Sequence, residues 1–171
     1  IIGASSGLGR ELAIKFAEEK NNLILISRDI RDLNAIKSDL ELRYKIRVEC
    51  IAIDFSSIEE INKKLLFKED IFKNINGILF PIGLMFENDN FEPNVDDIKK
   101  LIYANFLSIS FTLNKLSGFL KKQNASIIGF GSVSGLLGRN LNPNYSAAKR
   151  GLESYFESLA FEEKFQNTKI K

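Results

Sequence analysis

The sequence predicts an α/β fold, a doubly wound parallel sheet with helices on both faces. Short apolar runs alternate with amphipathic segments along the whole chain, which is the pattern of strand–helix–strand units. Some of these runs are apolar at every position, which is typical of strands buried on both faces. The 171 residues are 44% hydrophobic and 27% charged, as in an ordinary globular protein. We therefore interpret residues 1–171 as one domain.

The first half of the chain contains three strand–helix units. Each predicted helix repeats apolar residues at helical spacing, and each predicted strand is a short apolar run. Ser57 and Glu60 form a capping-box pattern at the start of the third helix. The expected elements are a strand ending at residues 1–2, a helix over 8–20, a strand over 23–27, a helix over 29–44, a strand over 47–53 and a helix from 57 to about 72.

The second half repeats the alternation with longer helices. Pro81 and Gly83 end the fourth strand, and a loop rich in Gly and Asn follows the fifth. The expected elements are a strand over 77–80, a loop through 94, a helix over 95–121, a strand over 126–130, a loop over 131–144, a helix over 144–165 and the start of a sixth strand over 168–171.

Composition and charge exclude several classes of function. The formal net charge is +2 and the lysines are scattered among acidic residues, so no basic stripe predicts nucleic-acid binding. No apolar run is long enough to span a bilayer. The sequence has one cysteine, Cys50, in an apolar strand pattern, and we see no secretory signal, so we expect core packing for Cys50 and a cytoplasmic location.

The absence of histidine is the most decisive count. A Ser-His-Asp triad and a His-ligated metal site are both impossible within these 171 residues. A single cysteine cannot form a thiolate zinc site, so we expect no metal.

The segment Ile1–Arg10, IIGASSGLGR, places three glycines between a strand and a helix. A strand, a glycine turn and a helix N-terminus form a phosphate cradle, because backbone N–H groups and the helix dipole favour anions there. The pattern Gly3-x-Ser5-x-Gly7 also matches a hydrolase nucleophile elbow. Without a histidine base, the hydrolase interpretation of Ser5 is the weakest of the alternatives.

Polar and small residues follow the carboxyl end of each predicted strand. In a parallel α/β sheet ligands bind at this edge. The segments concerned are the glycine turn, Ser27-Arg28, Asp54-Phe55, Pro81-Ile82-Gly83 and Ser132. We expect them to converge on one site.

Tyr145 and Lys149 are spaced i, i+4 on the last long helix and share one face. A nearby ammonium lowers the pKa of a phenol, so this pair could transfer a proton near neutral pH. The alternative is a surface lysine beside a half-buried tyrosine.

Taken together, these motifs resemble the short-chain dehydrogenase/reductase family, in its single-domain branch with a Rossmann-like fold. Gly3-x3-Gly7-x-Gly9 matches the family's glycine turn. Ser132 lies 13 residues before Tyr145, and with Lys149 the three match the family's catalytic residues in type, order and spacing. Asn105 matches the asparagine of the family's catalytic tetrad, and Asp54 its adenine-contacting aspartate.

The resemblance implies hydride transfer between a nicotinamide cofactor and a carbonyl or alcohol substrate. It implies that Tyr145 exchanges the proton, Ser132 positions the carbonyl oxygen, Lys149 tunes Tyr145 and binds the ribose, and Asn105 supports a proton relay. The implied cofactor-binding residues are Gly3, Ser5, Ser6, Gly7, Leu8, Gly9, Ser27, Arg28, Asp54, Phe55, Pro81, Ile82, Gly83, Tyr145 and Lys149.

The end of the second strand predicts a preference for NADP(H), with NAD(H) as the alternative. Enzymes that prefer NAD place an acidic residue there to bind the ribose 2′-hydroxyl. Here Ser27 is followed by Arg28, and a guanidinium suits a 2′-phosphate. Asp29 next to it is a competing partner for Arg28.

The sequence also departs from the family pattern. Phe80-Pro81-Ile82-Gly83 replaces the usual Asn-Asn-Ala-Gly after the fourth strand. The chain opens inside a strand and stops before the family's later strands and its lid, so we expect truncation at both ends and missing C-terminal strands.

Three alternatives to a reductase remain. A non-catalytic NAD(P)-binding regulatory protein is favoured by the altered segment 80–83, and a related epimerase or dehydratase is disfavoured by the glycine spacing. The Ser5 hydrolase comes last. The segment 131–145 resembles reductases of lipid-linked keto-sugars, which suggests a keto-sugar or polyol substrate.

The two long helices carry apolar stripes, and related enzymes pair these helices between subunits. We therefore expect a homodimer or homotetramer; the alternative is that the stripes pack on the sheet. The stripes consist of Phe106, Ile109, Leu113 and Leu116 on one helix and Leu152, Tyr155, Phe156 and Leu159 on the other.

Overall fold

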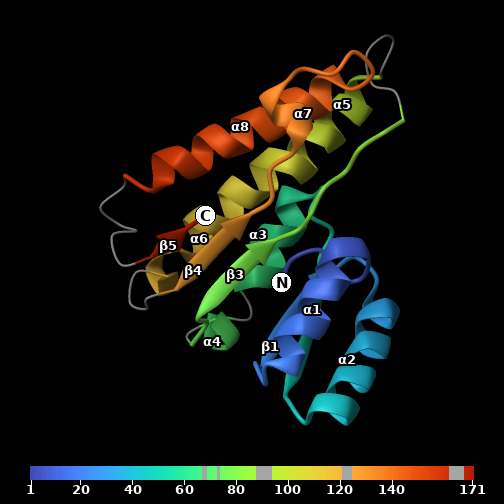
Figure 1. Ribbon diagram of the computed structural model, residues 1–171, viewed down its shortest axis with the longest axis vertical. Coiled ribbons are helices and arrows are strands. Elements are labelled where there is room, and N and C mark those ends of the chain that lie inside the picture. Colours follow the sequence, from blue (N-terminus) through green and yellow to red (C-terminus); the bar gives the residue numbers. More distant parts are fainter. Residues whose placement is uncertain (67–68, 73, 88–93, 121–124, 162–167) are drawn as a thin grey trace.

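A computed structural model describes residues 1–66, 69–72, 74–87, 94–120, 125–161 and 168–171. Strands and helices alternate as expected (Figure 1). In chain order the elements are α1 (Gly7–Glu18), β1 (Leu23–Ser27), α2 (Ile30–Tyr44), β2 (Val48–Ala52), α3 (Ile58–Leu66), α4 (Glu69–Phe72), β3 (Gly77–Phe80), α5 (Val95–Ile102), η1 (Tyr103–Leu107), α6 (Ser108–Leu120), β4 (Ser126–Gly129), α7 (Val133–Leu136), α8 (Pro143–Leu159) and β5 (Lys169–Ile170).

The strands are all parallel, and the first residues of the chain join them into one layer. β1 pairs with β2, and β4 pairs with β3 on one side and β5 on the other. Ile2 bridges Ile26 of β1, and its N–H donates to the carbonyl of Leu79 in β3 (2.9 Å). The order across the sheet is therefore β2, β1, the segment 1–2, β3, β4 and β5. Successive strands are added on one side of segment 1–2 in the first half of the chain and on its other side in the second half. The carboxyl end of segment 1–2 is therefore the expected ligand site.

Alternating side chains of β1 enter two separate cores, one on each face of the sheet. Leu23 and Leu25 pack with buried residues of α1 and α2, whereas Ile26 packs with those of α3, α6 and α8. Figure 1 shows the same division, with α1 and α2 together beside β1, and α6 and α8 along β3 and β4. The two cores confirm the predicted α/β fold with helices on both faces. Cys50 is half-buried against the α1–α2 core, with its thiol directed at the carbonyl of Leu33 (3.5 Å).

Only one of the two hydrogen bonds of the predicted capping box forms at the start of α3. The hydroxyl of Ser57 accepts from the N–H of Glu60 (3.3 Å), as expected. The Glu60 carboxylate does not return to the N–H of Ser57, which donates to the carbonyl of Asp54. It accepts instead from the N–H of Asp54 (2.9 Å) and from Lys64 (2.9 Å). Glu60 therefore holds the chain just after β2, at Asp54, rather than closing the helix cap.

Three predicted helix or loop ranges were wrong, and a fourth, the helix from 57 to about 72, is only partly covered by the described residues. The helix predicted over 95–121 is interrupted by the π-helical turn η1, and α6 ends at Leu120, with residue 121 outside the described residues. The loop predicted over 131–144 contains the short helix α7. The helix α8 ends at Leu159 rather than 165, and residues 162–165 lie outside the described part of the chain. α3 ends at Leu66 and α4 begins at Glu69, so the single helix expected to residue 72 is assigned as two, with 67–68 undescribed.

The apolar stripes of the long helices pack on the sheet, which was the alternative to a subunit interface. They are buried in the core except for Phe106 and Tyr155, which are half-buried and meet edge to face with ring centroids 6.0 Å apart. The buried members are Ile109, Leu113, Leu116, Leu152, Phe156 and Leu159. These six side chains are therefore not available to a second subunit.

Candidate active site

The glycine turn brings the N-terminus of α1 close to the first strand segment. Gly3 and Gly7 have φ values of 91° and 48°, a region that L side chains rarely adopt. A Cβ on Gly9 would overlap the carbonyl oxygen of Gly3, so α1 can pack here only without a side chain. A Cβ on Gly3 would lie 3.3 Å from the Cα of Ile82, so the turn also touches the segment after β3.

A cavity of about 610 Å³ opens at the N-terminus of α1. It is bordered by the ends of β1, β2 and β3, and by one face of α5. Its lining includes the predicted cofactor-binding residues Gly3, Ser5, Ser6, Gly7, Leu8, Ser27, Arg28, Asp54, Phe55, Pro81, Ile82 and Gly83. Gly9, Tyr145 and Lys149, also predicted to bind cofactor, are not part of the lining. Four of the five segments predicted to converge thus line one cavity, and the fifth, at Ser132, is not part of its lining.

Two polar contacts fix the cavity wall at the first two strand ends. The hydroxyls of Ser5 and Ser27 are 2.7 Å apart. The Asp54 carboxylate accepts from the N–H and the hydroxyl of Ser56 (2.9 and 2.8 Å), which turns the chain after the third strand segment. Ser6 is the N-cap of α1, yet its side chain makes no capping bond. Its hydroxyl is therefore not committed to the helix.

Arg28 is exposed at the cavity rim, and Asp29 does not compete for it. The Asp29 carboxylate caps α2 by accepting from the N–H of Arg31 (2.8 Å) and pairs with the Arg31 guanidinium (2.6 Å). These bonds lower the pKa of Asp29 to about 2, chiefly through the Arg31 side chain. Arg28 forms no ion pair within the described residues, so its guanidinium is free to meet an anion.

Lys149 and Asn105 both lie close to Gly83. A Cβ on Gly83 would be 3.4 Å from Oδ1 of Asn105 and 3.7 Å from Nζ of Lys149. Lys149 is 3% exposed, and Nζ donates to the carbonyls of Phe130 (2.9 Å) and Ile82 (3.4 Å). Burial lowers the pKa of Lys149, and the charge of Glu153 opposes that shift. The segment 81–83, although it lacks the family's asparagines, thus supplies backbone contacts to the predicted catalytic lysine.

Asn105 is fully buried inside the π-helical turn η1. Its amide nitrogen donates to the carbonyls of Leu84 (2.7 Å) and Leu101 (3.0 Å), and its oxygen accepts from the N–H of Leu84 (3.1 Å). π-Helical turns occur often at functional sites. The side chain therefore connects the long helix to the strand end beside Lys149.

Ser132 and Tyr145 lie at the starts of two neighbouring helices. Ser132 is the N-cap of α7, and its hydroxyl oxygen accepts from the N–H of Ser134 (3.2 Å). That bond uses a lone pair and leaves the hydroxyl proton available for a carbonyl oxygen. Tyr145 is half-buried in the first turn of α8, one turn before Lys149. α7 packs against α8, the helix that carries Tyr145.

The sequence did not predict part of the cavity wall or one contact of the loop that carries Ser132. Leu84, Phe86, Asp97, Lys100 and Ala104 also line the cavity. Three of them, at 97, 100 and 104, recur on one face of the helix, a spacing that could have predicted their shared direction. The missed contact is that of Glu153 with the N–H of Ser132 (3.4 Å), which no local pattern announces.

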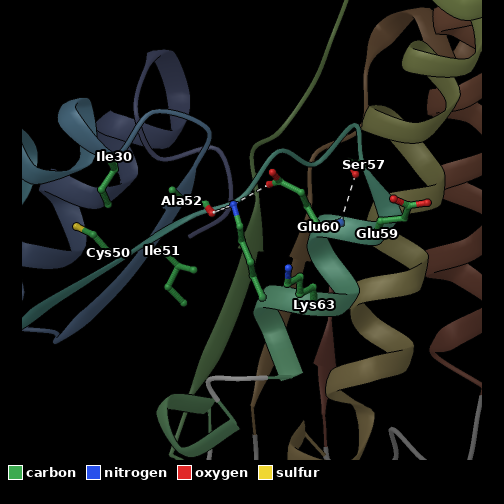
Figure 2. A pocket seen from close by; sticks show the side chains of 9 residues that line it. Ile30, Cys50, Ile51, Ala52, Ser57, Glu59, Glu60 and Lys63 are labelled. Atoms are coloured by element: carbon green, nitrogen blue, oxygen red, sulfur yellow. Dashed lines mark hydrogen bonds and ion pairs between the residues drawn. The ribbon is translucent and has the colours of Figure 1, made fainter.

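A second cavity of about 590 Å³ lies outside this region, at the open edge of β2. Its lining comes from β2, the start of α2 and α3 (Figure 2). Lys64, which also lines it, donates to the carbonyl of Ala52 (2.8 Å) and to Glu60 (2.9 Å). The side chains of α3 therefore occupy hydrogen-bonding positions of an edge strand. Among the described residues no group of acidic or cysteine side chains is arranged to hold a metal ion.

The first cavity fits a dinucleotide by its own geometry. The glycines leave the backbone open at the N-terminus of a 12-residue helix, where a pyrophosphate is stabilised. Arg28 at the rim suits a phosphate, and the far wall leads to Lys149 and Asn105. No helix in the described ranges is both long enough and apolar enough to cross a bilayer.

Comparison with known proteins agrees with this geometry. A family model described as short chain dehydrogenase matches residues 1–171. A very-long-chain 3-oxoacyl-CoA reductase of Vanderwaltozyma polyspora is 29% identical over 187 residues, covering 100% of this chain and 52% of the relative. The chain thus spans about half the length of the curated relatives it matches.

Two solved structures share the fold. A short-chain dehydrogenase from Sphingobium yanoikuyae in complex with NADPH superposes with a TM-score of 0.88 at 22% identity, over 100% of this chain and 67% of the other. L-Sorbose reductase from Gluconobacter frateurii, complexed with NADPH and L-sorbose, gives a TM-score of 0.91 at 20% identity, over 99% and 65%. With the family model matched from the first residue to the last, this chain belongs to the short-chain dehydrogenase family.

Proposed function

We propose that this chain binds NADP(H) and catalyses the reversible reduction of a carbonyl group to an alcohol. The observation that carries the proposal is the continuity between the glycine-lined cavity and Lys149, which donates to the carbonyl of Ile82 in the cavity wall. When bound, the cofactor supplies or accepts the hydride at the substrate carbon.

The chain's own residues manage the proton and the oxygen. Tyr145 donates its phenolic proton to the carbonyl oxygen as the carbon becomes tetrahedral, and Ser132 donates a hydrogen bond to the same oxygen. Lys149 is held by the carbonyls of Phe130 and Ile82, one turn from Tyr145. A fixed ammonium there stabilises the phenolate that remains after proton transfer. Asn105 holds the segment after β3 against the long helix, beside Lys149.

Two observations support NADP(H) over NAD(H). Arg28 stands at the end of β1 on the cavity rim, and Asp29 is engaged with Arg31. A fluorescence titration with NADPH and with NADH tests the preference. We expect NADPH to bind at least about tenfold more tightly, because a charge-assisted bond to the 2′-phosphate is lost with NADH. Equal affinities would refute the role of Arg28 while leaving the reaction open.

For the substrate we propose a carbonyl compound with an apolar chain, and a keto-sugar or polyol as the second candidate. Around Ser132 several large apolar side chains are exposed, and Arg139 is the sole charged residue in the segment 131–145. The exposed side chains are Val133, Leu136, Leu137, Leu141 and Met85. Met85 precedes Phe86, whose carbonyl accepts a hydrogen bond from Asn142. The name of the matched 3-oxoacyl-CoA reductases supports the first candidate. The likeness of segment 131–145 to keto-sugar reductases supports the second.

NADPH oxidation with two substrate sets separates these candidates. A 3-oxoacyl thioester series of increasing chain length should show kcat/KM rising with length, since each buried methylene contributes about 0.8 kcal/mol. A polar series of L-sorbose and related ketoses should show little turnover. The reverse order would favour the keto-sugar. NADPH binding without turnover of any carbonyl in either series would favour a cofactor-binding regulatory protein.

We also propose a homodimer or homotetramer that uses the outer faces of the two long helical segments, η1–α6 and α8. The half-buried pair Phe106 and Tyr155 supports it. Light scattering over a range of concentrations tests it, and a clean monomer at high concentration would refute it.

A further inference from the structure

Glu153 lies beneath the loop that carries Ser132. It stands on α8, one turn after Lys149, and its side chain is half-buried. Its Oε1 accepts a hydrogen bond from the N–H of Ser132 (3.4 Å). No other carboxylate bonds to a backbone group of segment 130–136 in the described part of the chain.

Two glycines make room for this carboxylate. A Cβ on Gly131 would lie 2.5 Å from Oε1 of Glu153, a distance that real Cβ atoms do not show. A Cβ on Gly135 would lie 3.1 Å from the same oxygen. The loop thus closes over a single oxygen atom, with bare backbone on both sides of it. A side chain at position 131 would displace either the loop or the carboxylate.

The same loop is tied to α8 at two further points. Phe130 accepts from Lys149 (2.9 Å), and the carbonyls of Gly135 and Leu136 accept from Arg150 (3.2 Å each). These contacts bracket Ser132 without touching it. Ser132 itself is bonded within its own turn, because its hydroxyl accepts from the N–H of Ser134 and its carbonyl from the N–H of Gly135 (2.8 Å). The bond from its N–H to Glu153 is the one that ties the residue to α8.

We propose that Glu153 is a positioning residue for Ser132: its carboxylate, seated between Gly131 and Gly135, holds the backbone that aims the Ser132 hydroxyl at the substrate oxygen. The inference rests on the proposed function, because it assigns Ser132 the task of binding a carbonyl oxygen. Glu153 exchanges no proton with the substrate and holds the Ser132 backbone. Its charge also acts on the pKa of Lys149, an effect that hydrogen exchange at Ser132 does not report. The positioning of Ser132 requires a hydrogen-bond acceptor at this place rather than a negative charge.

The test compares Glu153→Ala with Glu153→Gln, which keeps an acceptor oxygen. Glu157→Ala is the matched control, since Glu157 is an exposed glutamate one turn further along the same helix. One readout is amide hydrogen exchange of Ser132, which needs no activity. The other is the separation of kcat from the KM for NADPH.

We expect Glu153→Ala to speed exchange at Ser132 and lower kcat by about tenfold each, the effect of losing one hydrogen bond to a charged group. The KM for NADPH should stay within about twofold, because the cavity lining does not include this loop. Glu153→Gln should recover most of both effects, and Glu157→Ala should behave as the unaltered protein. Unchanged exchange in Glu153→Ala, or equal losses in Glu153→Gln, would overturn the proposal.

A double-mutant cycle with Gly131→Ala gives an independent check. The added methyl group should perturb Ser132 strongly when Glu153 is present and weakly in Glu153→Ala, because the second change removes the atom it meets. Additive effects would overturn the proposal. Should the protein show no reductase activity, the proposed function fails, yet the exchange data still decide whether Glu153 positions Ser132. Should Glu153→Ala not fold, Gly131→Ala and Glu153→Gln alone decide it.

Discussion

The side-chain amide of Asn105 pairs with both backbone groups of Leu84. Its nitrogen donates to the Leu84 carbonyl at 2.7 Å and its oxygen accepts from the Leu84 N–H at 3.1 Å. The two residues are 21 positions apart, one in a π-helical turn and one after β3. This pairing imitates a rung of β-sheet between a side chain and a backbone. It joins the helix that covers the sheet to the segment that borders the cofactor cavity.

Replacing Asn105 with Ala should destabilise the protein. It would remove the three hydrogen bonds that the Asn105 side chain makes to the backbone of Leu84 and Leu101, at a cost of about 2–3 kcal/mol. Urea unfolding measures this change in the free energy of unfolding. Asn114→Ala is the control, because Asn114 is an exposed residue that donates to the carbonyl of Ser110 (2.9 Å). Equal losses in the two variants would contradict the role of the buried pairing.

Replacing Tyr145 with Phe should abolish carbonyl reduction and leave the cofactor site intact. The phenolic proton is lost, and general acid catalysis of this kind contributes about 10²- to 10⁴-fold to the rate. NADPH affinity, measured by fluorescence, should change by less than about twofold, because Tyr145 is not part of the cavity lining. Retained turnover would assign the proton to another group.

Replacing Arg28 with Ala should weaken NADPH binding far more than NADH binding. The expected loss is about 10- to 100-fold for NADPH, the value of a charge-assisted bond to a phosphate. Increasing the salt concentration should reduce the difference, because Arg28 is exposed. Arg31→Ala is the matched control, since Arg31 is a neighbouring arginine already paired with Asp29. A parallel loss for both cofactors would contradict a 2′-phosphate contact.

Lys149 should make folding stability depend on pH in the alkaline range. Burial lowers its pKa below the ordinary 10.5, so between the two values the unfolded chain binds the proton and the folded chain does not. Stability therefore rises as pH increases through that interval and levels off above 10.5. Relative to Lys149→Met, which cannot titrate, the unaltered protein should gain stability over this range. Parallel urea-unfolding curves for both proteins at every pH would refute the shift.

Lys64 should protect the open edge of β2 against association. Its Nζ covers the carbonyl of Ala52 and pairs with Glu60 across the second cavity. Because the pair is partly exposed, Lys64→Ala should cost at most about 1 kcal/mol in stability. It should nevertheless increase aggregation, since an uncovered strand edge can pair with another chain. Lys63→Ala, an exposed neighbour, is the control, and the rate of light scattering is the measurement.

The sequence predicted the elements that depend on local pattern. β1 and β3 have the boundaries expected from their apolar runs, because continuous burial leaves a clear signal at each end. The convergence of the strand ends followed from parallel topology, and four of the five predicted segments line one cavity, the exception being that of Ser132. The family assignment followed from motif residues that lie far apart in the chain but match the family in type, order and spacing.

Contacts between distant segments could not be predicted in this way. The π-helical turn is not a property of Tyr103–Leu107 alone; its central residue is held by Leu84. The capping pattern at Ser57 was right for the hydroxyl and wrong for Glu60, because the N–H of Asp54 takes the carboxylate. Nothing in the local sequence distinguishes Glu153 from other polar helix residues, because its bond to Ser132 depends on how the loop packs on α8.

The turn η1 also restricts how this sequence can change over evolutionary time. An α-helix advances about 100° per residue, so removing one residue from the turn would rotate everything after it by that amount. The rotation would carry the buried face of α6, including Ile109, Leu113 and Leu116, out of the core. Substitutions at exposed positions of this helix are tolerable, but insertions and deletions within 103–107 are not. Descendants of this chain should therefore keep the number of residues in the turn even where the residues themselves are substituted.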